Sequence, residues 1–171
     1  MLALNTEQLH LRTMVESDWP LFVRLHTEPL TMQFVFGELA EEQIRKGFDH
    51  RLPAWTPQSE HWLCLVVIDK ASKQELGVSG MRILSPGHAE VGTLLLPEFQ
   101  GKGFGTEARK AIIDYAAAIG LESLESTVTD GNIASCKVLE NCGFTFERRV
   151  PQAYRIGDQW FDDLIYQLRL G

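Results

Sequence analysis

The stretch Gln100-Gly101-Lys102-Gly103-Phe104-Gly105-Thr106 follows an apolar segment and opens an amphipathic one. Its three glycines lack the Cβ atoms that would keep a ligand away from the backbone, and they permit the positive φ angles that turn several N–H groups toward one point. A helix that begins here adds unpaired N–H donors and the positive end of its dipole. The stretch therefore predicts a loop that holds a phosphate-bearing ligand. The alternative is a tight turn that only lets a strand and a helix pack closely.

The spacing of this loop argues against two common phosphate-binding motifs. A Walker A loop ends in Gly-Lys-Ser/Thr, whereas Lys102 precedes the last two glycines here. A dinucleotide fingerprint would need a glycine at position 106, where the chain has threonine, and it would open a parallel sheet. The segments before the loop instead predict antiparallel strands, because short polar turns join them.

The rest of the chain predicts a sheet with helices on it. Alternating or continuous apolar runs bounded by turn residues indicate strands, and apolar residues at three- and four-residue spacing indicate helices. After the glycine loop we expect a helix with an apolar face, and with Arg109, Lys110 and Asp114 on its polar side. Asn132 is the expected N-cap of the next helix, which Gly143 ends. The expected strands are 9–12, 62–68, 76–84, 89–96, 124–128, 144–154 and 160–170, and the expected helices lie at about 18–27, 41–52, 104–119 and 132–142.

Composition narrows the class of protein. A chain of 171 residues with 44% hydrophobic and 23% charged residues is typical of one globular domain, here 1–171. The net charge of −7 and the scattered Lys and Arg residues argue against a nucleic-acid partner, although they fit a cationic substrate as well as simple solubility. Without a signal peptide or a long apolar run, we expect no membrane partner and a cytoplasmic protein. Three cysteines without CxxC spacing and five dispersed histidines predict free buried thiols and no metal site.

Two motifs in this order resemble a known family. The pattern Gln100-x-x-Gly103-x-Gly105 behind the strand Glu90–Leu96 resembles the acetyl-CoA signature of the GNAT N-acetyltransferases. Downstream, Asn132-x-x-Ser135 followed by Leu139–Phe144 resembles the family's second motif. The segments 97–103 and 153–162 narrow the resemblance to the Rim-type branch, which acetylates the N-termini of ribosomal proteins and other amines. The resemblance implies an α+β GNAT fold: a mostly antiparallel twisted sheet of six to seven strands with about four flanking helices, and with a V-shaped splay between the fourth and fifth strands.

The resemblance also implies acetyl-CoA as cosubstrate. In such a fold the strand at 89–96 diverges from the strand at 124–128, and the pantetheine arm pairs with the exposed strand edge as an added strand would. The diphosphate then lies on the amides of the glycine loop, and an amine attacks the thioester directly, with a backbone N–H near Leu95 available for the developing oxyanion. The cofactor-binding residues that we expect are Thr93, Leu94, Leu95, Gln100, Gly101, Lys102, Gly103, Phe104, Gly105, Thr106 and Asn132.

Three residues are candidates for proton transfer. Glu90 begins the strand beside the opening and is the candidate base, acting through water, unless it is an ordinary solvated carboxylate. Many relatives carry a tyrosine acid seven residues after the motif asparagine, but this chain has Leu139 there. Ser135 matches a serine that the Rim-type branch places near the thioester, so we nominate it as the acid; otherwise it is a polar residue in a first helical turn. Tyr154 in the final hairpin is a further candidate.

The acceptor is open on sequence grounds. An α-amino group, with a pKa of about 8, is more readily neutral than a lysine near 10.4, so we expect a protein or peptide N-terminus. A polyamine or another small amine is an alternative, and so is a non-catalytic acyl-CoA-binding protein, which the missing tyrosine would permit. The region Thr27–Pro57 is where we expect substrate choice to be made. For the assembly we expect a monomer or a homodimer.

Overall fold

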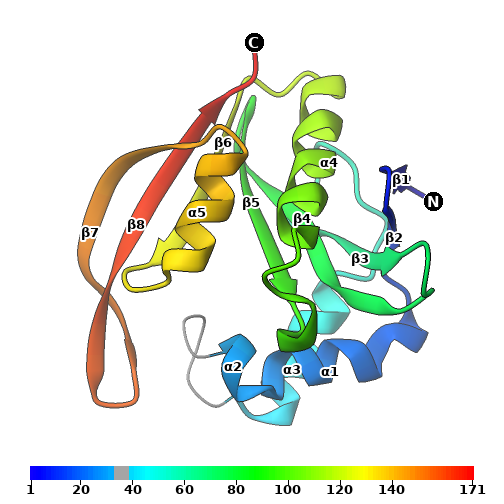
Figure 1. Ribbon diagram of the computed structural model, residues 1–171, viewed down its shortest axis with the longest axis horizontal. Helices are drawn as coiled ribbons and strands as arrows, with labels where there is room; N and C mark the ends of the chain where they lie inside the picture. Colours follow the sequence, from blue (N-terminus) through cyan, green and yellow to red (C-terminus); the bar gives the residue numbers. More distant parts are fainter. Residues whose placement is uncertain (33–38) are drawn as a thin grey trace.

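The computed structural model describes residues 1–32 and 39–171. Its centre is one eight-stranded sheet in the order β1-β2-β3-β4-β5-β6-β8-β7 (Figure 1). Every neighbouring pair is antiparallel except β5 and β6, which run parallel. The strands are β1 Ala3–Asn5, β2 Leu9–Thr13, β3 Leu63–Asp69, β4 Glu75–Ser85, β5 His88–Leu95, β6 Ser123–Thr129, β7 Thr145–Ile156 and β8 Gln159–Arg169.

Helices cover both faces of this sheet. On one face α4 packs against β1, β2, β4 and β5, and α5 lies between α4 and β6 in contact with both. On the other face α1 and α3 enclose a second apolar cluster with β3 and β4 (Figure 1). The helices are α1 Trp19–Thr27, α2 Pro29–Met32, α3 Glu41–His50, α4 Phe104–Ala118 and α5 Ile133–Asn141.

The parallel pair β5 and β6 separates after a short contact. Its register joins His88 to Ser123, Ala89 to Leu124 and Glu90 to Glu125, and no further pair follows. Beyond Glu90, β5 continues to Leu95 and β6 to Thr129, so the two strands form the arms of a V that opens toward the glycine loop (Figure 1). The predicted α+β architecture, a mostly antiparallel sheet with helices on it and two splayed strands, is confirmed. The short β1 was not predicted, so the splayed strands are the fifth and sixth of eight.

Two expectations about buried residues were wrong. Arg109 does not lie on the polar side of α4, because it is buried together with Ala108, Ala111, Ile112 and Ala116. Position 109 borders the apolar stripe of the helix, and its side chain reaches Ser126 on β6. Of the three free cysteines only Cys64 is buried; Cys136 and Cys142, on or next to α5, are half-buried.

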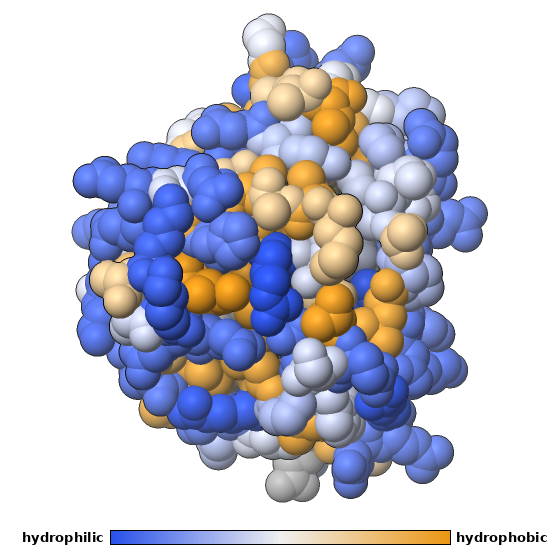
Figure 2. Space-filling view, turned by 90° about the vertical axis from the view of Figure 1, so that its right-hand side faces the viewer, coloured by the Kyte–Doolittle hydropathy of each residue, from blue (hydrophilic) through white to orange (hydrophobic). Residues whose placement is uncertain are grey.

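The surface that carries β1 has a mixed character. Figure 2 shows this face, where hydrophobic side chains form small groups between hydrophilic ones. None of the described helices is long and apolar enough to span a membrane. In the described ranges no three His, Cys, Asp or Glu side chains gather closely enough to hold a metal ion. Of the expected substrate-choice region 27–57, residues 33–38 lie outside the described residues, and the rest includes α2 and α3.

Candidate active site

The glycine loop presents a row of unpaired amides. A 3-10 turn at Pro97–Phe99 leads into it, and Gln100 fixes its start by donating from Nε2 to the Leu95 carbonyl at 3.0 Å. Gly101 and Gly103 have φ angles of 73° and 87°, which favour glycine. The first helical hydrogen bond of α4 runs from the Glu107 amide to the Gly103 carbonyl, and no side chain caps the helix. Within the described residues, the amides of 101–106 therefore have no acceptor, which is the arrangement that binds an anion.

Not every glycine of the loop is needed for the same reason. Gly101 and Gly103 require the left-handed backbone, and a Cβ at either position would meet no atom of the described residues within 4 Å. Gly105 has no such φ, and its Cβ would lie 3.6 Å from Leu95 Cδ1, an ordinary contact. The open space beside Gly101 and Gly103 is therefore not filled by the protein itself.

A hydrogen-bonded chain closes the narrow end of the V. Ser126 on β6 donates from Oγ to the Val91 carbonyl on β5 at 3.1 Å, one residue beyond the last strand pair. Arg109 on α4 donates from Nη1 to the same Ser126 oxygen at 3.3 Å. These bonds connect α4, β5 and β6 at the point where the two strands begin to diverge.

Arg109 is an unusual cation for such a position. Its side chain is only 6% exposed, and none of the described carboxylates forms an ion pair with it. Burial lowers the pKa of its guanidinium to about 10. Sequence reasoning missed this residue because a charged side chain was assigned to the polar face by type.

Glu90 is held at the vertex of the V by partners on both sides. Its Oε1 accepts from Arg82 Nη2 on β4 at 3.1 Å, and its Oε2 accepts from Thr127 Oγ1 on β6 at 3.3 Å. The side chain is 20% exposed. Glu90 is thus a bound carboxylate and not a freely solvated one, while its role as base stays a prediction.

The two candidate acids lie on different elements. Ser135 is in the first turn of α5, where its amide donates to Asn132 Oδ1 at 3.3 Å, so the predicted cap is present. Leu139, which stands where many relatives have tyrosine, is fully buried. Tyr154 on β7 stacks on Phe161 with ring centroids 6.3 Å apart. Burial and the charge of Asp163 raise the pKa of Tyr154 to about 12, so its phenol keeps its proton at neutral pH.

The comparisons with known proteins agree with this geometry. Residues 8–145 match the sequence profile described as an acetyltransferase (GNAT) domain. The chain belongs to the GNAT acetyltransferase family. It is 29% identical over 80 residues to the uncharacterized N-acetyltransferase YnaD of Bacillus subtilis (strain 168), an alignment that covers 46% of this chain and 47% of YnaD. The chain thus spans about half the length of this curated relative.

Solved GNAT structures share the whole fold. An acetyltransferase from Salmonella typhimurium that modifies the N-terminal serine of a 50S ribosomal subunit protein superposes with a TM-score of 0.85 at 20% identity, covering 99% of this chain and 100% of that one. The spermidine N-acetyltransferase from Vibrio cholerae, in complex with CoA and spermine, gives a TM-score of 0.82 at 21% identity and covers 96% and 97% of the two chains. At these identities the likeness establishes the GNAT fold.

A carboxylate that sequence reasoning missed lies on the far arm of the V. Asp163 on β8 pairs in register with Thr129, the last residue of β6, and its Oδ1 is buried without a hydrogen-bond partner in the described part of the chain. Burial, then the charges of Glu90 and Asp162, raise the pKa of Asp163. The sequence did hold one signal for this residue. Side chains alternate between the two faces of a strand, so Asp163 shares a face with Ile165, which is buried.

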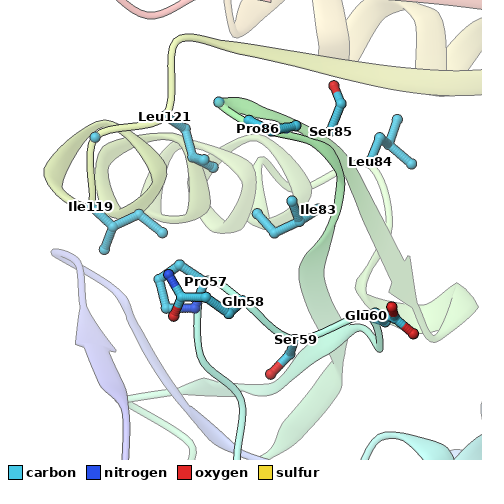
Figure 3. A pocket seen from close by; sticks show the side chains of 12 residues that line it. Pro57, Gln58, Ser59, Glu60, Ile83, Leu84, Ser85, Pro86, Ile119 and Leu121 are labelled. Atoms are coloured by element: carbon cyan, nitrogen blue, oxygen red, sulfur yellow. The ribbon is translucent and has the colours of Figure 1, made fainter.

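A surface hollow of about 550 Å³ lies elsewhere on this GNAT domain (Figure 3). It is bounded by the connection at 57–60, the turn between β4 and β5 and the residues that follow α4, at the opposite end of α4 from Gly103. Ile83, Ile119 and Leu121 form much of its wall. None of the predicted site residues lines this hollow, so it is separate from the candidate active site.

Proposed function

We propose that this GNAT protein transfers the acetyl group of acetyl-CoA to a primary amine. The observation that carries the proposal is the row of unpaired amides at 101–106, which stands at the open end of the V. A diphosphate is the ligand that suits these donors, because each N–H bond to a charged oxygen is charge-assisted. The splayed edge of β5 beyond Glu90 suits the pantetheine arm, since an amide-bearing chain can pair with an unpaired strand edge.

The residues around the V supply the proton chemistry of our proposal. A neutral amine attacks the thioester carbon, the C–N bond forms, and the C–S bond breaks to release the CoA thiolate. A carboxylate at the vertex takes a proton from the amine, for which Glu90 is placed, and a hydroxyl returns a proton to the thiolate. Ser135 on α5 and Tyr154 on β7 are the two hydroxyl candidates. Because the amine itself is the nucleophile, the protein supplies no covalent intermediate.

For the acceptor we favour a protein or peptide N-terminus over other amines. Residues 97–103 and 153–162 resemble the Rim-type branch, and an α-amino group reaches its neutral form more readily than a lysine. The polyamine alternative is supported by the net charge of −7, which suits a polycation. Incubation with acetyl-CoA and matched amounts of a serine-starting peptide and spermidine tests the choice. Faster acetylation of spermidine would overturn our preference, while acetylation of neither would count against transferase activity.

One observation supports a second function from another class. Leu139 is buried where many relatives have the tyrosine acid, so the chain could bind acyl-CoA without completing the transfer. Binding of acetyl-CoA by calorimetry, without release of the CoA thiol in the presence of any amine of a broad panel, would favour this non-catalytic function. Thiol release that depends on an added amine would exclude it.

A further inference from the structure

Asp163 is a half-buried carboxylate whose Oδ1 is buried and has no hydrogen-bond partner among the described residues. Its strand, β8, lies between β6 and β7, where Asp163 is in register with Thr129 on one side and Val150 on the other. The neighbouring Asp162 is different: it pairs with Arg149 at 2.8 Å and accepts the Gln152 amide at 2.9 Å. A buried oxygen without a hydrogen bond costs folding free energy, so its retention calls for a ligand or a proton.

The groups that face Asp163 add negative charge to the site. In addition to burial, the negative charges of Glu90 on β5 and Asp162 on β8 raise the pKa of Asp163. The charge of Asp163 in turn adds to burial in raising the pKa of the Tyr154 phenol on β7. Arg82 is engaged with Glu90, and none of the described cations forms an ion pair with Asp163. Among the described residues the carboxylates of this site outnumber its cations, and a cationic ligand would offset the excess negative charge.

Asp163 lies across the V from Glu90, the carboxylate at the vertex. The last β5–β6 pair is Glu90 with Glu125, while Asp163 stands opposite Thr129, further along the open arm of β6. Thr127 and Thr129 point to the same face of β6 because they are two residues apart, and Thr127 bonds Glu90. Glu90 and Asp163 thus lie on one face of the sheet, on opposite arms of the opening.

We propose that Asp163 binds the ammonium form of the acceptor and takes its first proton, an assignment that rests on the proposed acetyl transfer. Glu90 is less suited to this step, since both its oxygens already accept hydrogen bonds. The ammonium gives one proton to Asp163 and becomes the neutral nucleophile. When the C–N bond forms and the C–S bond breaks, the nitrogen loses its second proton to Glu90, while the candidate hydroxyl gives a proton to the CoA thiolate and regains one from Glu90. Asp163 then returns its proton to solvent, and the acceptor class is a primary amine that is cationic at neutral pH.

The test compares Asp163→Asn with the matched control Asp158→Asn in the exposed turn of the same hairpin. Turnover is measured from pH 6 to 10 with acetyl-CoA and either a serine-starting peptide or spermidine. We expect Asp163→Asn to lower kcat/KM about 100-fold at pH 7 and to recover as the pH rises, because the free amine then forms without help. CoA affinity should stay unchanged, and the control should behave as wild type. An Asp163→Asn protein with wild-type rates and pH profile would overturn the assignment.

A second measurement does not depend on activity or on a substituted protein. The carboxyl resonance of Asp163 in carbon-13-labelled wild-type protein is titrated with and without spermidine hydrochloride. We expect a titration midpoint above the ordinary aspartate range that falls when the polyamine is added, since a nearby cation favours the carboxylate. An unmoved midpoint at saturating spermidine and at saturating peptide would contradict our assignment. Absence of acetylation by wild-type protein, with a midpoint that does move, would instead count against the proposed transfer alone.

Discussion

Replacing Gly103 with alanine should separate the stability of the fold from its affinity for CoA. Gly103 is the N-cap of α4, with a φ of 87° and no atom of the described residues within 4 Å of an added Cβ. Gly120, just past the other end of α4, has a φ of 89° and the same open surroundings. Gly103→Ala and Gly120→Ala therefore impose the same backbone strain at the two ends of one helix, and only the first touches the candidate phosphate loop.

The magnitudes follow from the backbone geometry. A left-handed conformation costs an alanine about 1–2 kcal/mol, which for a chain of this size lowers the melting temperature by roughly 2–8 °C in either variant. Relief of that strain at position 103 turns the loop amides away from their common point. Loss of one charge-assisted hydrogen bond to the diphosphate, worth about 1.5–3 kcal/mol, weakens CoA binding roughly 10- to 150-fold.

Thermal unfolding and calorimetric titration with CoA measure the two effects separately. We expect both variants to melt earlier by similar amounts, and only Gly103→Ala to lose CoA affinity. A folded Gly103→Ala protein that binds CoA as tightly as Gly120→Ala would refute the assignment of the loop.

Three further predictions address other parts of the molecule. Ser135→Ala should lower kcat while CoA affinity stays the same, and an unchanged kcat under rate-limiting chemistry would remove Ser135 from the mechanism. Arg109→Met removes a buried cation that has no ion pair among the described residues, and it keeps an unbranched apolar side chain. It should leave the melting temperature level or higher and raise the KM for acetyl-CoA, because the bond to Ser126 is lost. A wild-type KM would show that this bond does not shape the V. Asp18 is 4% exposed; burial raises its pKa, but the hydrogen bonds from Arg12 and the Val15 amide outweigh this effect and lower the pKa overall. Asp18→Asn should therefore lower the free energy of unfolding by about 3 kcal/mol at pH values above the unfolded-state pKa near 3.8. This loss should disappear as the pH falls below the folded-state pKa, where the wild-type carboxyl is also neutral. Urea unfolding at several pH values measures the loss, and a loss that persists at low pH would contradict the prediction.

Local signals in the sequence were sufficient for most of the fold. The glycine loop, the hairpins around β4 and the Asn132 cap depend on residues a few positions apart, so their chemistry is readable from the chain. The three-residue β1 was too short to produce a periodic pattern. Arg109 and Asp163 were misjudged or missed because their surroundings depend on strands that are far apart in the sequence. Sequence patterns assign a charged side chain to solvent, and only the assembled sheet shows that Arg109 is buried and that Asp163 Oδ1 is covered.

We propose that this GNAT protein moves an acetyl group from CoA to an amine through the opening between β5 and β6. The most direct measurement is mass spectrometry after incubation with isotope-labelled acetyl-CoA and a mixed pool of N-terminal peptides, polyamines and amino acids. We predict a labelled acetyl group on an amine nitrogen, in an amount equal to the CoA thiol released, and at least about 10-fold less with Gly103→Ala at subsaturating acetyl-CoA. Tight CoA binding without any labelled amine in the pool would contradict the claim.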